Sequence, residues 1–406
     1  MKRSRIDRFI MAQEGLTLLD RATLEALQLA KLNAVLARMR AHGASYLPPQ
    51  IAQLADLATL PFTTAADLAA QPGRFLLTSQ GEVARIITDQ TSGTTAAAKR
   101  VFYTAEDVQH TIDFFAAGIS EMAQSGETVL ITMPFSGAMG LGDLIQQAVK
   151  KIGARSLCAG YGKSYAALAA LVRTHKPSCY IGFPVPLLSL ARYLGAACSI
   201  RRALISGDVC PPGVFAQLAE RFQLYPHYGS RELCLGGAIT CPAFAGMHLR
   251  ENHFIAEIID DDGQPLPAGA TGELVITTIG MTAMPIIRYR TGDRTHILAA
   301  PCPCGSVTRR IAQPVRMGQD AALQYALDDA LFALPQVIDT CVRQCGDTLH
   351  IQALCTQPDC ADVLRHAAQT VRPAVQVDCR RCTGSDTPLY AGKRKLIKEE
   401  TLCQQQ

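Results

Sequence analysis

The clearest periodic pattern of apolar residues lies near the N-terminus. Between residues 17 and 42, Leu and Ala recur at helical spacing with no internal Gly or Pro, and a segment from Gly43 to Pro49 follows directly. Apolar residues three and four positions apart share one face of a helix, whereas Gly and Pro interrupt helices. The pattern therefore predicts one amphipathic helix over 17–42.

From Val129 onward, short apolar runs alternate with helical stretches. The runs are 129–135, 178–184 and 201–209, and the helical stretches are 164–175 and 213–222. This alternation is typical of βαβ units around a parallel sheet.

After about Gly236 the pattern changes to short strands separated by turns. Residues 253–279 predict a hairpin closed around Asp262-Gly263, followed by another strand. Residues 319–334 return to helical periodicity, and two strands, 339–346 and 348–355, precede a helix at 361–371. We therefore expect a large N-terminal domain over 1–314, with a β-rich subdomain at 236–312, and a small mobile α+β domain over 315–406.

Composition narrows the class of protein. The chain has 406 residues, 48% hydrophobic and 18% charged, enough for more than one buried core. Its net charge is only +4, and its basic residues are scattered among acidic ones and form no long runs. Both features argue against nucleic acid as a partner. No run approaches the roughly 20 apolar residues that span a bilayer, and the N-terminus lacks a signal-peptide core. We expect a cytoplasmic protein that is not bound to membranes, in which most of the 15 cysteines are reduced.

A small-residue loop is the first candidate for chemistry. Thr91, Ser92, Gly93, Thr94 and Thr95 are consecutive, and Lys99 follows four positions later. Such a loop can bring backbone N–H groups and hydroxyls close to phosphate oxygens. A Ser/Thr turn at the start of a helix is the alternative. The spacing does not match G-x-x-x-x-G-K-[ST], which disfavours a P-loop kinase or GTPase.

This loop resembles the TSGTTGxPK loop of the adenylate-forming superfamily. Three further blocks follow in the order of that family: HYGSRE at 227–232, GELVIT at 272–277 and PIIRYRTGDR at 285–294. The phenylacetate–coenzyme A ligase branch is the most similar, over nearly the whole chain up to about Ala312. The resemblance implies an α/β fold, in which parallel sheets and a β-rich subdomain form the large domain and a small α+β domain follows.

The resemblance also implies the reaction and its participants. The enzyme would adenylate a small-molecule carboxylic acid with Mg·ATP, release pyrophosphate and transfer the acyl group to coenzyme A. The residues that the resemblance assigns to the nucleotide are Thr91, Ser92, Gly93, Thr94, Thr95, Lys99, Ser206, Gly207, Asp208, His227, Tyr228, Gly229, Ser230, Arg290 and Asp293. Lys393, Glu232 and Thr94 are the catalytic candidates.

Four of these roles have a clear physical reason. Asp293 would bond both ribose hydroxyls, and Tyr228 would stack on adenine. Glu232 would hold Mg²⁺, which prefers oxygen ligands. Lys393, in the GKRK segment, would bridge the attacking carboxylate and the α-phosphate.

Some of these assignments have competitors. Lys395 and Lys398 compete with Lys393, and Arg288 competes with Arg290.

The chain departs from the family pattern at Asp208, which is shifted by one position from the usual acid, and at two further places. Ala96 and Ala98 stand where Gly and Pro are usual, and the segment around Met317-Gly318 lacks the G-R-x-D-D hinge and the R-G-x-N pattern. Two alternatives therefore stay open: an adenylating enzyme with a carrier protein or another acceptor, and a degenerate nucleotide-binding, zinc-stabilised partner protein.

Cysteine and histidine spacing predicts a structural zinc site in the β-rich subdomain. Cys302 and Cys304 form a C-x-C turn, and Cys241 and His248 lie about sixty residues earlier. Three thiolates and one imidazole complete a tetrahedral set for Zn²⁺. His253 is the alternative to His248. Cys379 and Cys382 form a second pair, C-x-x-C, which we expect to be structural.

Overall fold

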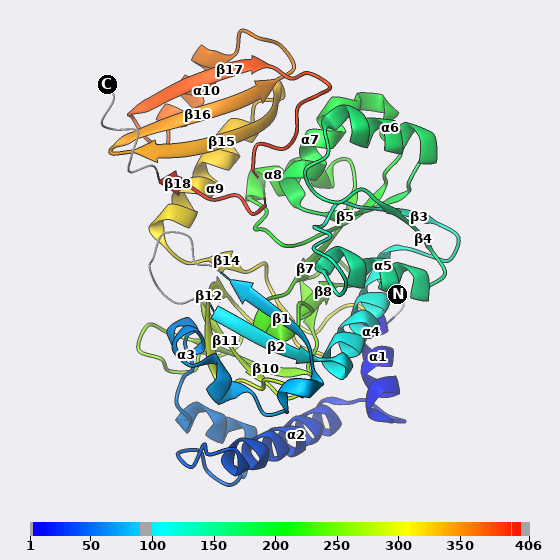
Figure 1. The fold of residues 1–406 in the computed structure, drawn as a ribbon, viewed down its shortest axis with the longest axis vertical. Helices are drawn as coiled ribbons and strands as arrows, with labels where there is room; N and C mark the ends of the chain where they lie inside the picture. The colour runs from blue at the N-terminus through cyan, green and yellow to red at the C-terminus, as the bar shows by residue number, and fades with distance from the viewer. Residues whose placement is uncertain (1–2, 90–98, 391, 399–406) are drawn as a thin grey trace. The chain divides into compact units, whose positions relative to one another are not determined.

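The computed structural model describes residues 3–89, 99–390 and 392–398 (Figure 1). The chain forms two compact units. Unit 1 comprises Met1–Glu121, Asp143–Lys151 and Pro226–Val315, and unit 2 comprises Met122–Gly142, Ile152–Tyr225 and Arg316–Gln406. The residues after Arg316 thus cluster with the middle of the chain, and the mobility of 315–406 stays a prediction.

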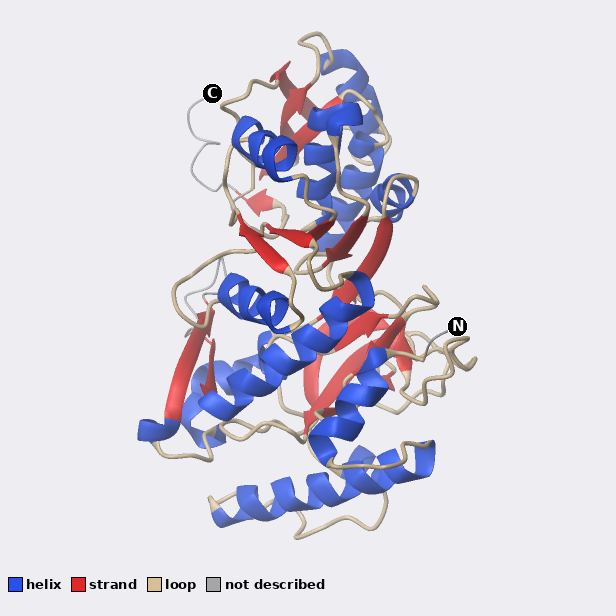
Figure 2. Ribbon diagram, turned by 90° about the vertical axis from the view of Figure 1, so that its right-hand side faces the viewer, coloured by secondary structure: helices blue, strands red, loops and turns tan. Residues whose placement is uncertain are grey.

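The long N-terminal helix begins later than its apolar pattern suggests. Helix α2 (Arg21–Ala41), at the bottom of Figures 1 and 2, starts at its N-cap Asp20, whose side chain accepts a hydrogen bond from the Thr23 N–H at 2.7 Å. This cap stops the helix from extending back to residue 17. A separate helix, α1 (Arg5–Glu14), precedes it and ends at Gly15, which has a left-handed φ of 65°.

The remaining elements of unit 1 are mainly strands. Strands β1 (Val83–Asp89) and β2 (Lys99–Thr104) pair antiparallel and lead into α4 (Ala105–Met122). Helices α3 (Ala65–Ala70) and α5 (Leu141–Lys151) also belong to this unit. Two further groups of strands follow along the chain: β7 (Gln223–Tyr228), β8 (Ala238–Thr240), β9 (Met247–Leu249) and β13 (Arg310–Ile311); and β10 (Phe254–Ile259), β11 (Gly272–Thr278), β12 (Tyr289–Thr295) and β14 (Val315–Arg316). Of these, β7 belongs to unit 1 only from Pro226 on, and β14 only at Val315.

The predicted hairpin at 253–279 is present with a different partner strand. Gly263 has a φ of 82° in the turn, but the main partner of β10 is β11, with Phe254 opposite Thr278 and Ile259 opposite Glu273. The segment directly after the turn contributes one isolated bridge, between Ile259 and Pro265. Continuous pairing of β10 therefore begins only at β11.

The middle of unit 2 confirms the predicted βαβ pattern. Strands β3 (Thr128–Ile131), β4 (Arg155–Cys158), β5 (Cys179–Gly182) and β6 (Arg202–Ile205) are parallel and lie in the order β6-β5-β3-β4. The helices of this part are α6 (Tyr165–His175), α7 (Pro184–Leu194) and α8 (Pro212–Ala219).

The last part of unit 2 is a four-stranded sheet with two helices behind it in Figure 1. Its order is β17-β16-β15-β18, and its elements are α9 (Gln319–Phe332), β15 (Val337–Cys345), β16 (Thr348–Cys355), α10 (Ala361–Gln369), β17 (Val375–Arg381) and β18 (Ile397–Lys398). The helix and two strands predicted from 319 to 355 are confirmed. Leu331 of α9 and Leu364 of α10 join Val342 and Ile351 in one buried core.

Candidate nucleotide-binding and metal sites

The small-residue loop is bracketed by a strand pair. Asp89, the last residue of β1, lies opposite Lys99, the first residue of β2. The loop residues themselves lie outside the described residues: Thr91, Ser92, Gly93, Thr94 and Thr95. What the structure describes of this block is therefore its two flanking strands and Lys99.

Lys99 forms an ion pair with Glu232 inside unit 1. The Lys99 ammonium contacts Glu232 Oε1 and lies 3.3 Å from the Tyr289 hydroxyl. The side chains of Lys99 and Glu232 are only 14% and 5% exposed. Burial raises the pKa of Glu232, but the Lys99 ammonium outweighs burial and holds that pKa below its ordinary value. Glu232 is therefore an ionised carboxylate at neutral pH.

Tyr228 and Asp293 also meet within unit 1. The Tyr228 hydroxyl, at the end of β7, donates to Asp293 Oδ2 of β12 at 2.9 Å. Gly292 has a φ of 71° at an irregularity in the pairing of β12 with β11, and the Asp293 N–H donates to Thr291 Oγ1 at 3.1 Å, which fixes the backbone of the aspartate. Desolvation and the Asp293 charge raise the pKa of Tyr228, which keeps the phenol protonated as a donor.

The residues around Tyr228 explain part of the HYGSRE block. A Cβ on Gly229 would lie 1.9 Å from the Leu235 carbonyl oxygen, so a larger residue does not fit. The backbone oxygen of Ser230 accepts hydrogen bonds from Leu233 N–H at 3.2 Å and Leu235 N–H at 2.8 Å. Burial lowers the pKa of His227 to about 4, and its ring lies 5.7 Å from that of Phe115.

The two competing arginines have different surroundings. Arg290 Nη2 lies 2.5 Å from Glu273 Oε2, and its side chain is 38% exposed. The buried Arg288 donates to Glu257 Oε2 at 3.1 Å and to the Ala58 carbonyl at 2.6 Å. Arg288 is thus held in the interior of unit 1 and is unsuited to a phosphate, whereas a phosphate or ribose role for Arg290 stays a prediction.

In unit 2, Asp208 and the Lys393 segment lie together. Asp208 Oδ2 accepts the Arg394 N–H at 2.7 Å, and Oδ1 accepts the Val209 N–H at 2.9 Å. Burial raises the pKa of Asp208 to about 6, although the Arg394 N–H and the Lys393 charge oppose that rise. The ammonium-bearing Lys393 itself is exposed.

Two small residues precede Asp208. Gly207 has a φ of 84°, and a Cβ there would lie 2.7 Å from the Phe183 ring. The Ser206 N–H donates to the Gly182 carbonyl at 3.1 Å, which continues the pairing of β6 with β5. Close approach therefore requires glycine at position 207.

Arg394 anchors this segment, and sequence reasoning did not single it out. Its guanidinium bonds both oxygens of Asp328, at 2.7 and 2.9 Å, and reaches Asp339 Oδ1 at 3.1 Å and Thr340 Oγ1 at 2.8 Å. The Arg394 side chain is 6% exposed. In sequence, Arg394 is one of several neighbouring basic residues, so only its buried acidic partners distinguish it.

The lysines that compete with Lys393 are also at the surface. Lys395 is exposed, and Lys398 Nζ lies 2.7 Å from Asp320 Oδ2 in an exposed ion pair.

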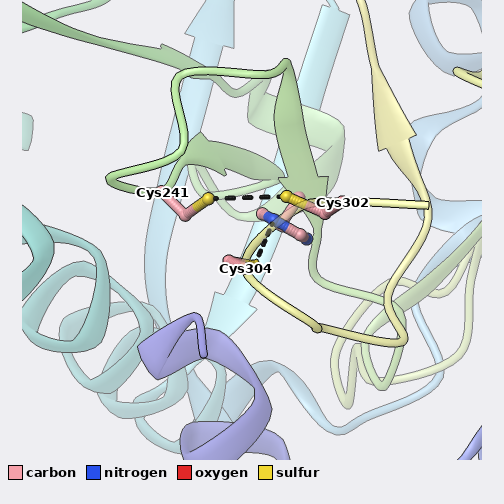
Figure 3. A group of neighbouring side chains, drawn as sticks. Cys241, Cys302 and Cys304 are labelled. Atoms are coloured by element: carbon pink, nitrogen blue, oxygen red, sulfur yellow. Dashed lines mark hydrogen bonds between the residues drawn. The ribbon is translucent and has the colours of Figure 1, made fainter. Parts of the chain in front are cut away.

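The predicted zinc ligands gather in unit 1. The donor atoms of Cys241, His248, Cys302 and Cys304 lie within 4.8 Å of one another, and all four residues are buried. Figure 3 shows the three thiols converging: Cys241 Sγ lies 3.7 Å from Cys302 Sγ, and Cys304 Sγ lies 3.5 Å from His248 Nε2. Among the described residues, this group contains His248 and not His253.

A polar chain orients the histidine of this group. His248 Nδ1 lies 2.8 Å from Thr308 Oγ1, Thr308 Oγ1 lies 2.9 Å from Ser306 Oγ, and Ser306 bonds the buried Asp7 of α1. With Nδ1 bonded to a hydroxyl, Nε2 is the nitrogen that faces the cysteines. No sequence pattern marks Thr308, Ser306 and Asp7 as supports of this group.

Comparison with known families and proteins supplies the context for these groups. Residues 77–284 match the model of the AMP-binding enzyme family. Phenylacetate-coenzyme A ligase of Thermus thermophilus is 26% identical over 362 residues, 81% of this chain and 80% of that protein. The Escherichia coli protein of the same name is 28% identical over 301 residues, 68% and 67% of the two chains.

Solved structures show the same fold. A crystal structure of 2-hydroxyisobutyryl-CoA ligase in the postadenylation state, in complex with R3-HIB-AMP, has a TM-score of 0.76 and 18% identity and covers 95% of this chain and 91% of that one. The same ligase with 2-HIB-AMP and CoA in the thioesterification state has a TM-score of 0.68 and 19% identity, with 94% and 91% covered. Within the described part of the chain, every helix is too short or too polar to cross a membrane.

Proposed function

Because the chain belongs to the AMP-binding enzyme family, we propose that it is an ATP-dependent carboxylate–coenzyme A ligase of the phenylacetate–coenzyme A ligase type. The observation that carries this proposal is the assembly, in unit 1, of residues from separate sequence blocks: Lys99 with Glu232, and Tyr228 with Asp293. Relatives named as phenylacetate-coenzyme A ligases over most of the chain support it.

The proposed reaction has two steps. In the first, a carboxylate oxygen of the acid attacks the α-phosphorus of ATP, the bond from that phosphorus to the bridging oxygen breaks, and pyrophosphate leaves. In the second, the sulfur of coenzyme A attacks the acyl carbon, its proton passes to solvent, and AMP leaves. Positioning and electrostatic stabilisation supply the catalysis, because neither step needs a nucleophilic side chain.

The residues of unit 1 would bind the nucleotide. Asp293 would accept hydrogen bonds from the ribose hydroxyls while Tyr228 holds its Oδ2, and the Tyr228 ring would offer a planar face to adenine. Glu232, an ionised carboxylate, fits Mg²⁺, which prefers oxygen ligands. When bound, Mg²⁺ would neutralise phosphate charge.

Lys393 would supply the positive charge for the first step. Lys393 is exposed, and the bond from the Arg394 N–H to Asp208 fixes the backbone next to it. A lysine carries a compact charge on a long stem, which suits the developing charge between carboxylate and α-phosphate.

A pyrophosphate-release screen over aryl, arylacetic and aliphatic acids tests the function. Release that requires both ATP and an acid is expected, together with a thioester when coenzyme A is added. Absence of acid-dependent release with every acid would instead favour the degenerate nucleotide-binding protein. Release without thioester, restored by a carrier protein, would favour the other acceptor.

We also propose that Cys241, His248, Cys302 and Cys304 bind a structural zinc ion. Four buried donors of the soft and borderline kinds that Zn²⁺ prefers lie within 4.8 Å, and a hydroxyl orients the histidine. We expect about one equivalent of zinc at this site, lost together with thermal stability in Cys304→Ser. Wild-type protein that keeps full stability after complete removal of its zinc would contradict this role.

A further inference from the structure

Three more cysteines converge in the last part of unit 2. Cys355 ends β16, Cys360 is the N-cap residue of α10, and Cys379 lies in β17. Their sulfur atoms all lie within 4.8 Å of one another. Cys379 thus has two partners that the sequence around it does not reveal.

The fold itself brings these thiols together. Strands β16 and β17 are parallel neighbours, with Ala353 opposite Cys379, so the end of β16 passes beside that cysteine. The chain then turns, with the Cys360 N–H bonded to the Pro358 carbonyl at 3.1 Å, before α10 begins. Each cysteine therefore comes from a different element: a strand end, a helix start and the neighbouring strand.

The surroundings of the three sulfurs are mostly apolar and partly open to solvent. Cys355 and Cys360 are buried, whereas Cys379 is half-buried. The Cys379 thiol donates to the Pro358 carbonyl at 3.0 Å, and the Cys360 thiol contacts the Gln357 carbonyl at 3.5 Å. Cys382 is outside this group, because its thiol points to the Thr383 carbonyl at 3.6 Å.

We propose that Cys355, Cys360 and Cys379 bind one zinc ion through three thiolates, with water in the fourth position beside half-buried Cys379. A Zn–S distance of about 2.3 Å places tetrahedral sulfur ligands roughly 3.8 Å apart, so the present spacing needs only small side-chain movements. Thiolates select soft or borderline ions such as Zn²⁺ over Mg²⁺ or Ca²⁺. Each thiol releases its proton to solvent as the Zn–S bond forms.

Such a site would hold the loop between β16 and α10 against β17. Strands β16 and β17 belong to the sheet that also contains β18, and β18 directly follows the Lys393 segment. The site would thus stabilise the part of unit 2 that supports the proposed catalytic lysine. The inference does not depend on the proposed function, because metal binding is measured without turnover.

Metal content of the full chain tests the proposal. We expect Cys360→Ser to contain about one equivalent of zinc less than the wild type after purification and dialysis in zinc-containing buffer. Cys382→Ser is the matched control, since it removes a nearby thiol outside the group, and it should keep the wild-type content. Equal zinc in Cys360→Ser and wild type would overturn the proposal, as would a loss in Cys382→Ser.

A second measurement covers the case in which Cys360→Ser fails to fold. In the intact wild type, a chelator should release this zinc and make the three thiols reactive toward a thiol reagent, identified by peptide mapping. Added Zn²⁺ should protect them again. Thiols whose reactivity is indifferent to chelator and Zn²⁺, or a disulfide between two of them in unreduced protein, would refute the site.

Discussion

Lys99 of unit 1 and Lys393 of unit 2 are the two lysines that we propose to act on ATP, and their surroundings are opposite. Lys99 is largely buried and paired with Glu232, so its position is fixed by another charge. Lys393 is exposed, and it is the neighbouring Arg394 whose side chain is locked between Asp328 and Asp339. The Lys99 side chain is thus fixed by its own ion pair, whereas the Lys393 side chain is exposed to solvent beside a buried, ion-paired arginine.

The largest effect is expected from breaking the buried pair. Lys99→Met leaves Glu232 charged and unpaired, which should destabilise the protein by about 3–5 kcal/mol, seen as a lower midpoint of urea unfolding. Adding Glu232→Gln to Lys99→Met removes the orphaned charge and should recover much of that loss. If the double variant is no more stable than Lys99→Met, the pair does not fix Lys99.

Lys393→Ala should reduce acyl-adenylate formation on the order of 10²-fold or more, because it removes a charge placed at the transition state. Single-turnover assays should show thioester formation from supplied acyl-adenylate nearly unchanged. Exposed Lys395→Ala is the control and should retain both steps. Equal loss of both steps in Lys393→Ala would exclude a role confined to adenylation, and unchanged adenylation would transfer the catalytic role away from Lys393.

Asp293→Ala should weaken ATP binding by about tenfold or more, because hydrogen bonds to a charged group contribute about 1.5–3 kcal/mol each. Isothermal titration measures the affinity. Tyr228→Phe, which removes only the hydroxyl that contacts Asp293, should have a smaller effect. Unchanged affinity in Asp293→Ala would show that the T-G-D block has only a structural role in β12.

The smallest effect concerns the support of Lys393. The pKa of Asp208 is raised from 3.8 to about 6, so between those pH values the folded protein binds more protons than the unfolded chain. The contribution of Asp208 to the free energy of unfolding therefore falls as pH rises through this window. Relative to Asp208→Asn, the wild type should lose about 1 kcal/mol or less from pH 4 to 6, since the residue is only half-buried.

Urea unfolding of both proteins at several pH values measures this difference. Parallel pH profiles for wild type and Asp208→Asn would show that Asp208 is not desolvated in the folded protein.

The features that the sequence predicted best are those that depend on residues close together along the chain. The blocks containing Tyr228, Glu232 and Asp293 were found because their residues are contiguous, and the parallel sheet was found because its strands and helices alternate. The later start of α2 came from a cap at Asp20, a boundary that apolar spacing does not mark.

What the sequence did not predict depends on contacts between distant segments. Arg394 has partners more than fifty residues away, at Asp328 and Asp339, so no local pattern separates it from other basic residues. Cys355 and Cys379 are brought together by the pairing of β16 and β17, and Cys360 by the turn that leads into α10. Side-chain partners of this kind follow from the register of strands, which single-sequence patterns leave open.

The hydrogen bond from the Ser306 hydroxyl to Asp7 can form only late in synthesis on the ribosome. The two residues are 299 positions apart, so at a synthesis rate of about 5–20 residues per second Ser306 is made roughly 15–60 s after Asp7. During that interval the neighbouring Ile6 and Ile10, which are fully buried in the finished protein, lack the later-made segments of unit 1. Until Ser306 has been made, the nascent N-terminal helix therefore lacks this hydrogen-bond partner and the later segments of its unit.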